Sequence, residues 1–122
     1  MSYKIYKNDS NVIEVTYTGS VNLDERKRAV EEACQLIRPT EPVRLLIDVR
    51  KITMNMSEQE QMEFGIYLAH RKELLEAKVA VLHNPKNNPN TVIDIHAYLE
   101  GYQLGEFDNE REAILWLIGE LN

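Results

Sequence analysis

Polar and apolar residues alternate in two short stretches near the beginning of the chain. Residues 3–7 and 12–18 both follow a period of two, which is the repeat of a strand with one buried face. The intervening Asn8-Asp9-Ser10-Asn11 has the composition of a tight turn. The pattern therefore predicts an antiparallel hairpin, whose second strand is closed by Gly19-Ser20.

Two nearly continuous apolar runs indicate strands that are buried on both faces. The first, Val-Arg-Leu-Leu-Ile-Asp-Val at residues 43–49, is followed by the basic pair Arg50-Lys51 and a short loop. The second covers residues 78–83. Continuous runs of this kind are typical of the interior strands of a parallel sheet. Residues 103–107 predict a further short strand at the edge of that sheet.

Apolar residues at helical spacing predict four helices between these strands. The first begins at Asn22, which is suited to cap it, and ends before Pro39. The second runs from about Ser57 to Glu76 and begins with a capping box formed by Ser57 and Glu60. The third covers residues 91–102, and the fourth follows Asn109. The residues expected to face the core in the last two helices are Val92, Ile95, Leu99, Ile114, Leu117, Ile118 and Leu121.

The resulting element order, β-β-α-β-α-β-α-β-α, predicts a single domain over residues 1–122. After the opening hairpin, strands and helices alternate, which implies parallel strands joined by right-handed crossovers. The predicted fold class is therefore α/β. We expect a small mixed sheet of about five strands, an antiparallel hairpin followed by parallel strands, with about four helices.

The charge of the chain narrows the range of its partners. Twenty acidic and 14 basic residues give a net charge of −6, and the lysines and arginines form no extended cluster. Because phosphate contacts depend on basic surface, we expect the protein to bind neither nucleic acid nor anionic lipid.

Targeting signals are missing from the sequence. No apolar run approaches the roughly 18 residues that span a bilayer, and the N-terminus lacks the apolar core of a signal peptide. We therefore expect a cytoplasmic protein without a membrane span. The single cysteine, Cys34, falls on the apolar stripe of the first helix and is expected to be a small core residue.

Motifs of catalysis and cofactor binding are also missing. His70, His83 and His96 do not follow a metal-binding spacing, and the five glycines are not clustered into a phosphate loop. Asp48 lies within a buried strand, where a carboxylate needs a partner such as Arg50, Lys51 or a helix N-terminus. We expect that pairing to be structural, and the protein to be non-enzymatic and without a cofactor or metal.

Three stretches of the chain carry a family resemblance. They are Val-Thr-Tyr-Thr-Gly-Ser-Val at residues 15–21, residues 46–53 with Leu-Ile-Asp-Val and Ile-Thr, and residues 107–117. Together with the element order, they resemble the STAS domains, the fold of the anti-sigma-factor antagonist SpoIIAA. More narrowly, they resemble the SpoIIAA-like group, which is often described together with the lipid-binding Sec14 fold. The resemblance implies a regulatory domain that acts by binding another protein.

The chain departs from the family's switch motif at the start of the second helix. Switchable STAS antagonists carry Asp-Ser-Ser-Gly or Asp-Ser-Thr-Gly there, and a kinase phosphorylates the second hydroxyl. This chain has Met56-Ser57-Glu58-Gln59 instead, with a glutamate at the acceptor position. The family's phosphorylation switch is therefore not carried over, and Ser57 is interpreted as a helix cap.

Two surfaces are candidates for function. Ligands of α/β folds are usually met at the carboxyl ends of parallel strands. That rule predicts a partner-binding surface made of Thr53, Asn55, Ser57 and Glu58, with His83 and Asn84 at its margin.

The alternative is an apolar pocket for a lipid-like ligand, as the Sec14 resemblance allows. Met54, Met56, Phe64 and Tyr67 would line it, because flexible thioethers and aromatic rings suit such a pocket. A homodimer is a third possibility, which rests on the last helix. There Trp116, beside Leu117, either anchors an interface or covers the core.

Overall fold

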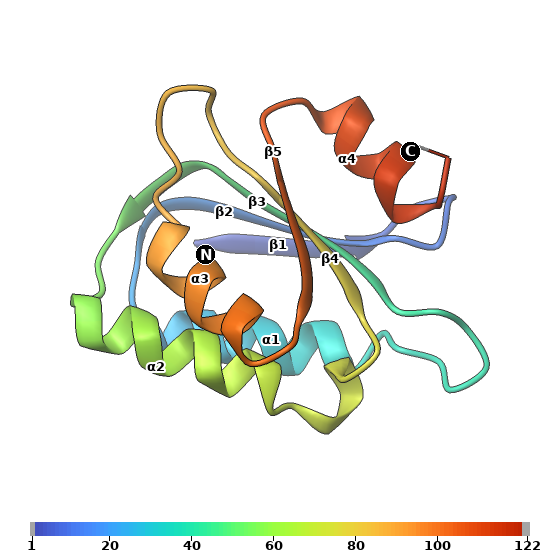
Figure 1. The fold of residues 1–122 in the computed structure, drawn as a ribbon, viewed down its shortest axis with the longest axis horizontal. Coiled ribbons are helices and arrows are strands. Elements are labelled where there is room, and N and C mark those ends of the chain that lie inside the picture. Colours follow the sequence, from blue (N-terminus) through green and yellow to red (C-terminus); the bar gives the residue numbers. More distant parts are fainter. Residues whose placement is uncertain (1, 121–122) are drawn as a thin grey trace.

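The computed structural model describes residues 2–120 and contains one five-stranded sheet with the strand order β1-β2-β3-β4-β5 (Figure 1). β1 and β2 form the predicted antiparallel hairpin, and β3, β4 and β5 lie parallel to β2. The strands are Tyr3–Lys7, Ile13–Val21, Arg44–Met54, Lys78–Leu82 and Gln103–Phe107. The predicted α/β class and mixed sheet are thus confirmed.

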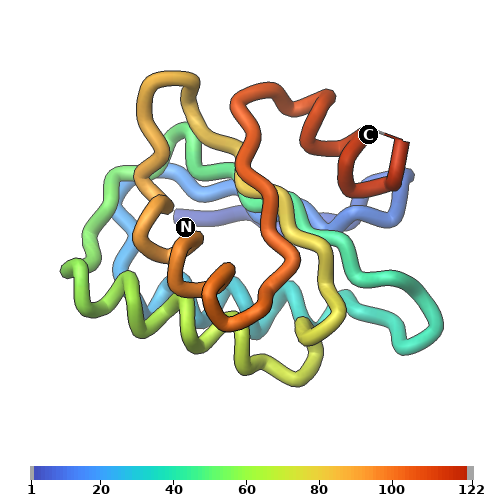
Figure 2. The backbone as a smooth tube through the Cα atoms, in the orientation of Figure 1, coloured from blue at the N-terminus to red at the C-terminus, as the bar shows by residue number. Residues whose placement is uncertain are grey.

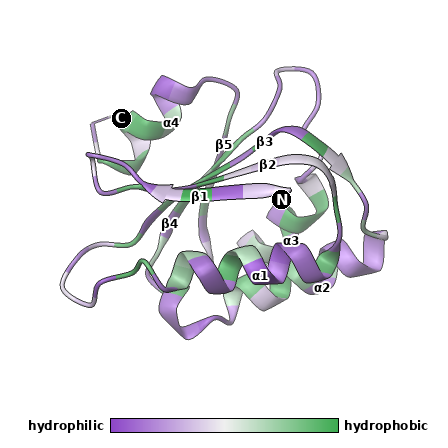
Figure 3. Cartoon of the chain, turned by 180° about the vertical axis from the view of Figure 1, so that it is seen from behind, coloured by the Kyte–Doolittle hydropathy of each residue, from purple (hydrophilic) through white to green (hydrophobic). Residues whose placement is uncertain are grey.

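Helices cover both faces of this sheet and enclose two apolar cores. α1 (Leu23–Cys34), α2 (Glu58–Ala69) and α3 (Thr91–Leu99) lie on one face, and α4 (Glu110–Leu117) lies on the other (Figure 3). The larger core forms beneath α1, α2 and α3. A smaller core forms beneath α4, where Ala113 and Leu117 pack on inward-facing residues of the sheet. Alternation along the interior strands supplies one face to each core.

The predicted apolar stripe of the last helix is only partly buried. Leu117 is buried, whereas Ile114 and Ile118 are half-buried, and Leu121 lies outside the described residues. Trp116 is half-buried and packs on Phe107, with the ring centroids 5.4 Å apart. Trp116 therefore covers the smaller core, which is one of the two roles expected for it.

β3 is longer than predicted. We expected a loop after Val49, but the strand continues through the basic pair to Met54. The reason is that residues 51–54 pair with residues 18–21 at the end of β2, beyond the point where β4 has ended. β3 thus projects past its neighbour β4 at the carboxyl end of the sheet.

α2 is shorter than predicted. It ends at Ala69 rather than near Glu76, and a 3₁₀ turn, η1 (Lys72–Leu74), follows. A helix continued to Glu76 would travel about 10 Å further in a straight line. The turn instead reverses the chain, buries Leu74 in the larger core and allows β4 to begin at Lys78.

The prediction of which face of α3 is buried was wrong. The helix buries Ile93 and Ala97, whereas Ile95 and Leu99 are exposed and Val92 is half-buried. The cause is close packing against Gly65 of α2, where an added Cβ would lie only 2.6 Å from the carbonyl oxygen of Ile93. Two helix backbones that approach so closely orient α3 by this contact rather than by its largest apolar side chains.

Candidate functional site

The predicted contact residues of the β3–α2 connection form one exposed segment. Thr53, Asn55, Ser57 and Glu58 are all exposed. Ser57 caps α2 as predicted: its Oγ accepts a hydrogen bond from the Glu60 amide at 3.1 Å, and the Glu60 carboxylate accepts one from the Ser57 amide at 2.9 Å. The Ser57 hydroxyl therefore already has a structural role.

His83 and Asn84 lie elsewhere on the same end of the sheet. The Asn84 side-chain amide donates to the carbonyl oxygen of Arg50 at 2.9 Å. The loop that follows β4 and the end of β3 lie at the same end of the sheet (Figure 2). Leu82, the last residue of β4, pairs with Asp48 of β3. Thr53 lies five positions further along β3, roughly 16 Å from Asp48. Asn84 itself contacts Arg50, three positions before Thr53, so it borders the part of β3 that leads into the exposed segment.

Asp48 has the structural partner that the sequence requires. Arg50 donates to both of its carboxylate oxygens, at 3.1 and 2.8 Å, and reaches Glu110 of α4 at 3.2 Å. The carboxylate within β3 is therefore held in a bidentate pair.

A groove that the sequence did not indicate lies between α3 and β5, and we call it the α3–β5 groove. It encloses about 390 Å³ and is lined by Thr91, Asp94, Ile95, Tyr98, Leu99, Leu104 and Glu106. Ile95, Tyr98 and Leu99 expose 51%, 66% and 72% of their surface. Within the described residues, β5 pairs only with β4, so its outer edge is open. The groove was missed because α3 was expected to turn Ile95 and Leu99 inward.

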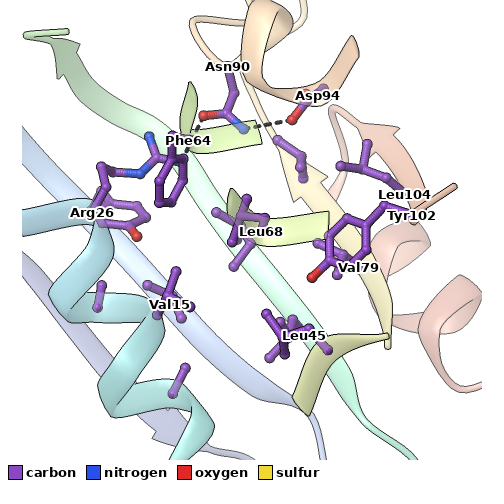
Figure 4. A pocket seen from close by; sticks show the side chains of 17 residues that line it. Val15, Arg26, Leu45, Phe64, Leu68, Val79, Asn90, Asp94, Tyr102 and Leu104 are labelled. Atoms are coloured by element: carbon purple, nitrogen blue, oxygen red, sulfur yellow. Dashed lines mark hydrogen bonds between the residues drawn. The ribbon is translucent and has the colours of Figure 1, made fainter. Parts of the chain in front are cut away.

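A second space lies inside the larger core, between the sheet and α1, α2 and α3 (Figure 4). The cavity measures about 40 Å³, and most of its lining is apolar. Of the four residues expected to line a pocket, Phe64 lines it, whereas Met54, Met56 and Tyr67 do not. Tyr67 turns outward, where its hydroxyl donates to Glu31.

The size of this cavity limits its contents. An engineered apolar cavity of about 150 Å³ holds one benzene, and a single water needs roughly 10–15 Å³. The cavity therefore has room for a few small molecules the size of water, or for one compact organic ion, and is too small for a lipid chain.

One end of the cavity is polar although it is buried. Arg26, Asn90 and Asp94 expose no more than 3% of their surface. Arg26 Nη2 donates to Asn90 Oδ1 at 2.9 Å, and Asn90 Nδ2 donates to Asp94 Oδ1 at 2.6 Å, as the dashed lines in Figure 4 mark. Asn88 Nδ2 in turn contacts Asp94 at 3.1 Å and Glu106 at 2.5 Å. A chain of amides thus separates the buried cation from two carboxylates.

The buried carboxyl group of Asp94 has an unusual protonation state. Burial, and after it the neighbouring Glu106, raise the pKa of Asp94 to about 8. At pH 7 Asp94 is therefore mainly the neutral acid. Arg26 was not singled out from the sequence, although it lies three and four residues before Ala29 and Val30 on the buried stripe of α1. That spacing could have indicated that Arg26 lies on the buried face of α1.

Other chemistry is sparse. Within residues 2–120, no three His, Cys, Asp or Glu side chains are placed to hold a metal ion together, and no helix has the length and apolar content to cross a membrane. Cys34 is half-buried, and burial raises the pKa of its thiol. A raised pKa lowers the fraction of the reactive thiolate.

Comparison with known proteins identifies the fold. No family model matches the sequence, and no curated protein matches it. Among solved structures, the chain is similar to an uncharacterised protein of the DUF3478 family from Shewanella loihica PV-4, which has a SpoIIAA-like fold. The two are 16% identical, the match covers 94% of this chain and 91% of that one, and the TM-score is 0.61. This chain therefore has the SpoIIAA-like fold that the sequence resemblance implied.

Proposed function

We propose that this SpoIIAA-like domain is a non-enzymatic interaction domain whose α3–β5 groove binds a segment of a protein partner. The observation that carries the proposal is the exposure of Ile95, Tyr98 and Leu99 on one short helix. Contiguous exposed apolar side chains beside a concave surface are typical of protein-binding sites.

The open edge of β5 supports the same conclusion. An unpaired strand edge offers backbone donors and acceptors to an incoming chain, and adjacent apolar side chains supply affinity. Complete burial of one large apolar side chain contributes about 1.5–3 kcal/mol. Covering the three partly exposed side chains of α3 therefore contributes a few kcal/mol toward a reversible complex, with backbone pairing at β5 adding to it.

Charge favours a basic partner over a second copy of this chain. Apart from the buried Asp94, residues 91–107 contain the acidic residues Glu100 and Glu106 but neither lysine nor arginine. Two copies that met through this groove would bring like charges together, whereas a partner segment with lysine or arginine would complement them. We therefore propose an apolar segment flanked by basic residues as the occupant.

The β3–α2 connection is a second candidate contact surface. Its support is the joint exposure of Thr53, Asn55, Ser57 and Glu58, together with its position at the site of the family's switch motif. Because Glu58 stands at the acceptor position, we propose that contacts there are not controlled by phosphorylation of that residue.

Site-specific photo-crosslinking in the native host distinguishes these surfaces. A photoreactive phenylalanine derivative replaces Tyr98, Asn55 or, as the control, Leu75, which is 62% exposed but lies outside both surfaces. We expect one protein adduct at position 98 that is absent at position 75, with the crosslinked peptide containing apolar and basic residues. The adduct is then rebuilt from purified components.

The other outcomes are equally informative. An adduct at position 55 alone would show that the partner binds at the β3–α2 connection and not in the α3–β5 groove. The same adducts at all three positions, or none at any, would contradict a specific protein-binding role.

A further inference from the structure

Arg26 is a buried cation whose donors are only partly used. Its side chain exposes 1% of its surface, and one nitrogen, Nη2, donates to Asn90. Nε and Nη1 are buried without a hydrogen-bond partner among the described residues. Buried guanidinium donors left unpaired are costly, so a site of this kind favours an acceptor that reaches them.

The protein compensates the charge of Arg26 incompletely. The guanidinium carbon lies 4.5 Å from the ring centre of Tyr17 and 4.9 Å from that of Phe64, which are favourable cation–π contacts. Its hydrogen-bond acceptor, however, is a neutral amide, and Asp94 lies beyond that amide. Since Asp94 is mainly protonated at pH 7, it supplies little negative charge there.

The cavity beside Arg26 defines what else can enter. Residues such as Ala29, Leu45 and Val79 give it apolar walls, and Tyr102 adds a buried hydroxyl that has no hydrogen-bond partner among the described residues. A ligand of about the size of the cavity must therefore combine one anionic acceptor group with a short apolar body. Sulfate and phosphate do not fit this description, because they carry acceptors on every side.

We propose that the core cavity is a binding site for a monocarboxylate no larger than acetate, whose carboxylate accepts hydrogen bonds from the unpartnered nitrogens of Arg26 while its methyl group lies against the apolar wall. This site is separate from the α3–β5 groove and does not depend on the proposed protein contact. Guanidinium–carboxylate hydrogen bonds are among the strongest in proteins.

The test is a titration of the purified chain at pH 7 and constant ionic strength. Sodium acetate is the probe, sodium butyrate is the size control because it has as many non-hydrogen atoms as benzene, and sodium chloride and sodium sulfate are the ionic controls. We expect a saturable shift of the Arg26 Nε–H resonance in ¹⁵N-edited spectra with acetate and not with butyrate. Thermal midpoints should rise with the logarithm of the acetate concentration once that concentration exceeds the dissociation constant, because a ligand of the folded state stabilises it by RT ln(1 + [L]/Kd).

Two variants assign the effect to the site. Arg26→Met keeps the length of the side chain, removes its donors and should weaken carboxylate binding by about ten- to hundredfold, as expected for the loss of charged hydrogen bonds. Arg71→Met is the matched control, because Arg71 is a half-buried arginine that pairs with Glu31 and does not line the cavity. It should retain wild-type affinity.

The wild-type titration remains decisive if Arg26→Met does not fold. A saturable shift of the Arg26 resonance with a carboxylate and not with sulfate supports the site. A resonance that does not move with acetate, or that moves linearly and equally with every salt, would overturn the proposal and leave water as the occupant of the cavity.

Discussion

Each side of α3 carries an exception to the usual relation between polarity and exposure. On its inner side, Asp94 is 3% exposed and is held by Asn88 and Asn90. On its outer side, Leu99 is 72% exposed and Tyr98 is 66% exposed. A surface helix normally places its apolar stripe inward and its charges outward. The helix therefore meets two different requirements, a polar end to the core cavity and an apolar wall for the α3–β5 groove.

The comparison shows that backbone packing, rather than hydrophobicity, sets the orientation of α3. Contact with Gly65 places Ile93 and Ala97 at the helix interface, and the larger apolar residues turn outward as a result. Exposure of these side chains has a cost in solubility that the proposed partner would remove. The buried Asp94 on the inner side has a cost of its own, because its raised pKa makes the stability of the fold depend on pH.

The largest expected effect comes from Asp94. The pKa of this group is about 8 in the folded chain against an ordinary value of 3.8, so the folded state holds a proton that the unfolded state releases. Stability should therefore fall as pH rises from about 4 to about 8, by at most about 1.4 kcal/mol per pH unit from this group. Asp94→Asn should abolish that part of the slope, as measured by urea unfolding across this range.

The groups around Asp94 provide the control for that experiment. Asn88 and Asn90 contact it directly, Glu106 of β5 faces it, and Arg26 of α1 reaches it through Asn90. Glu106→Gln removes the neighbouring charge but not the burial, so it should reduce the slope without abolishing it. Equal slopes in wild type and Asp94→Asn would show that Asp94 is ionised in the core.

The next largest effect concerns the contact that orients α3. Alanine at position 65 gains up to about 1 kcal/mol in helix propensity over glycine. Its Cβ, however, would meet the Ile93 carbonyl at 2.6 Å and His96 at 3.1 Å. Gly65→Ala should therefore destabilise the protein by about 1–3 kcal/mol, as overpacking does.

Chemical denaturation measures this change, with Met62→Ala on the exposed side of α2 as the control. A more stable Gly65→Ala variant would mean that the two helices lie further apart than the structure has them.

The smallest effect on stability is expected on the outer side of α3. Ile95→Ser and Leu99→Ser remove apolar side chains that are mostly in water, so each should change the free energy of unfolding by no more than about 0.5 kcal/mol. Ile93→Ser, two residues before Ile95 but fully buried, should cost several times more. Similar losses for Ile93→Ser and Leu99→Ser would show that Leu99 packs within the fold.

The sequence predicted the sheet well because its signals are local. The apolar run of β3, the turn of the opening hairpin and the caps at Asn22 and Ser57 all act within a few residues. The length of β3 depended on pairing with the end of β2, and the orientation of α3 depended on a glycine in another helix. Such long-range contacts leave no local pattern.

The candidate sites were harder to predict for the same reason. Thr53, Asn55, Ser57 and Glu58 are exposed as expected, but their position relative to His83 and Asn84 depends on how far β3 extends past β4. The α3–β5 groove and the polar end of the cavity each combine residues from distant parts of the chain. Arg26 and Asn90 are 64 positions apart and meet only in the folded structure.

The central claim is that the outer side of α3 binds the protein partner. The most direct measurement is the dissociation constant between the purified chain and the partner identified by crosslinking, for wild type, Leu99→Asp and Leu75→Asp. Each variant places one charge on an exposed apolar position, but only Leu99 lines the groove. We predict at least a roughly tenfold loss of affinity for Leu99→Asp, which corresponds to about 1.4 kcal/mol, and wild-type affinity for Leu75→Asp. Equal dissociation constants for all three proteins would contradict the account.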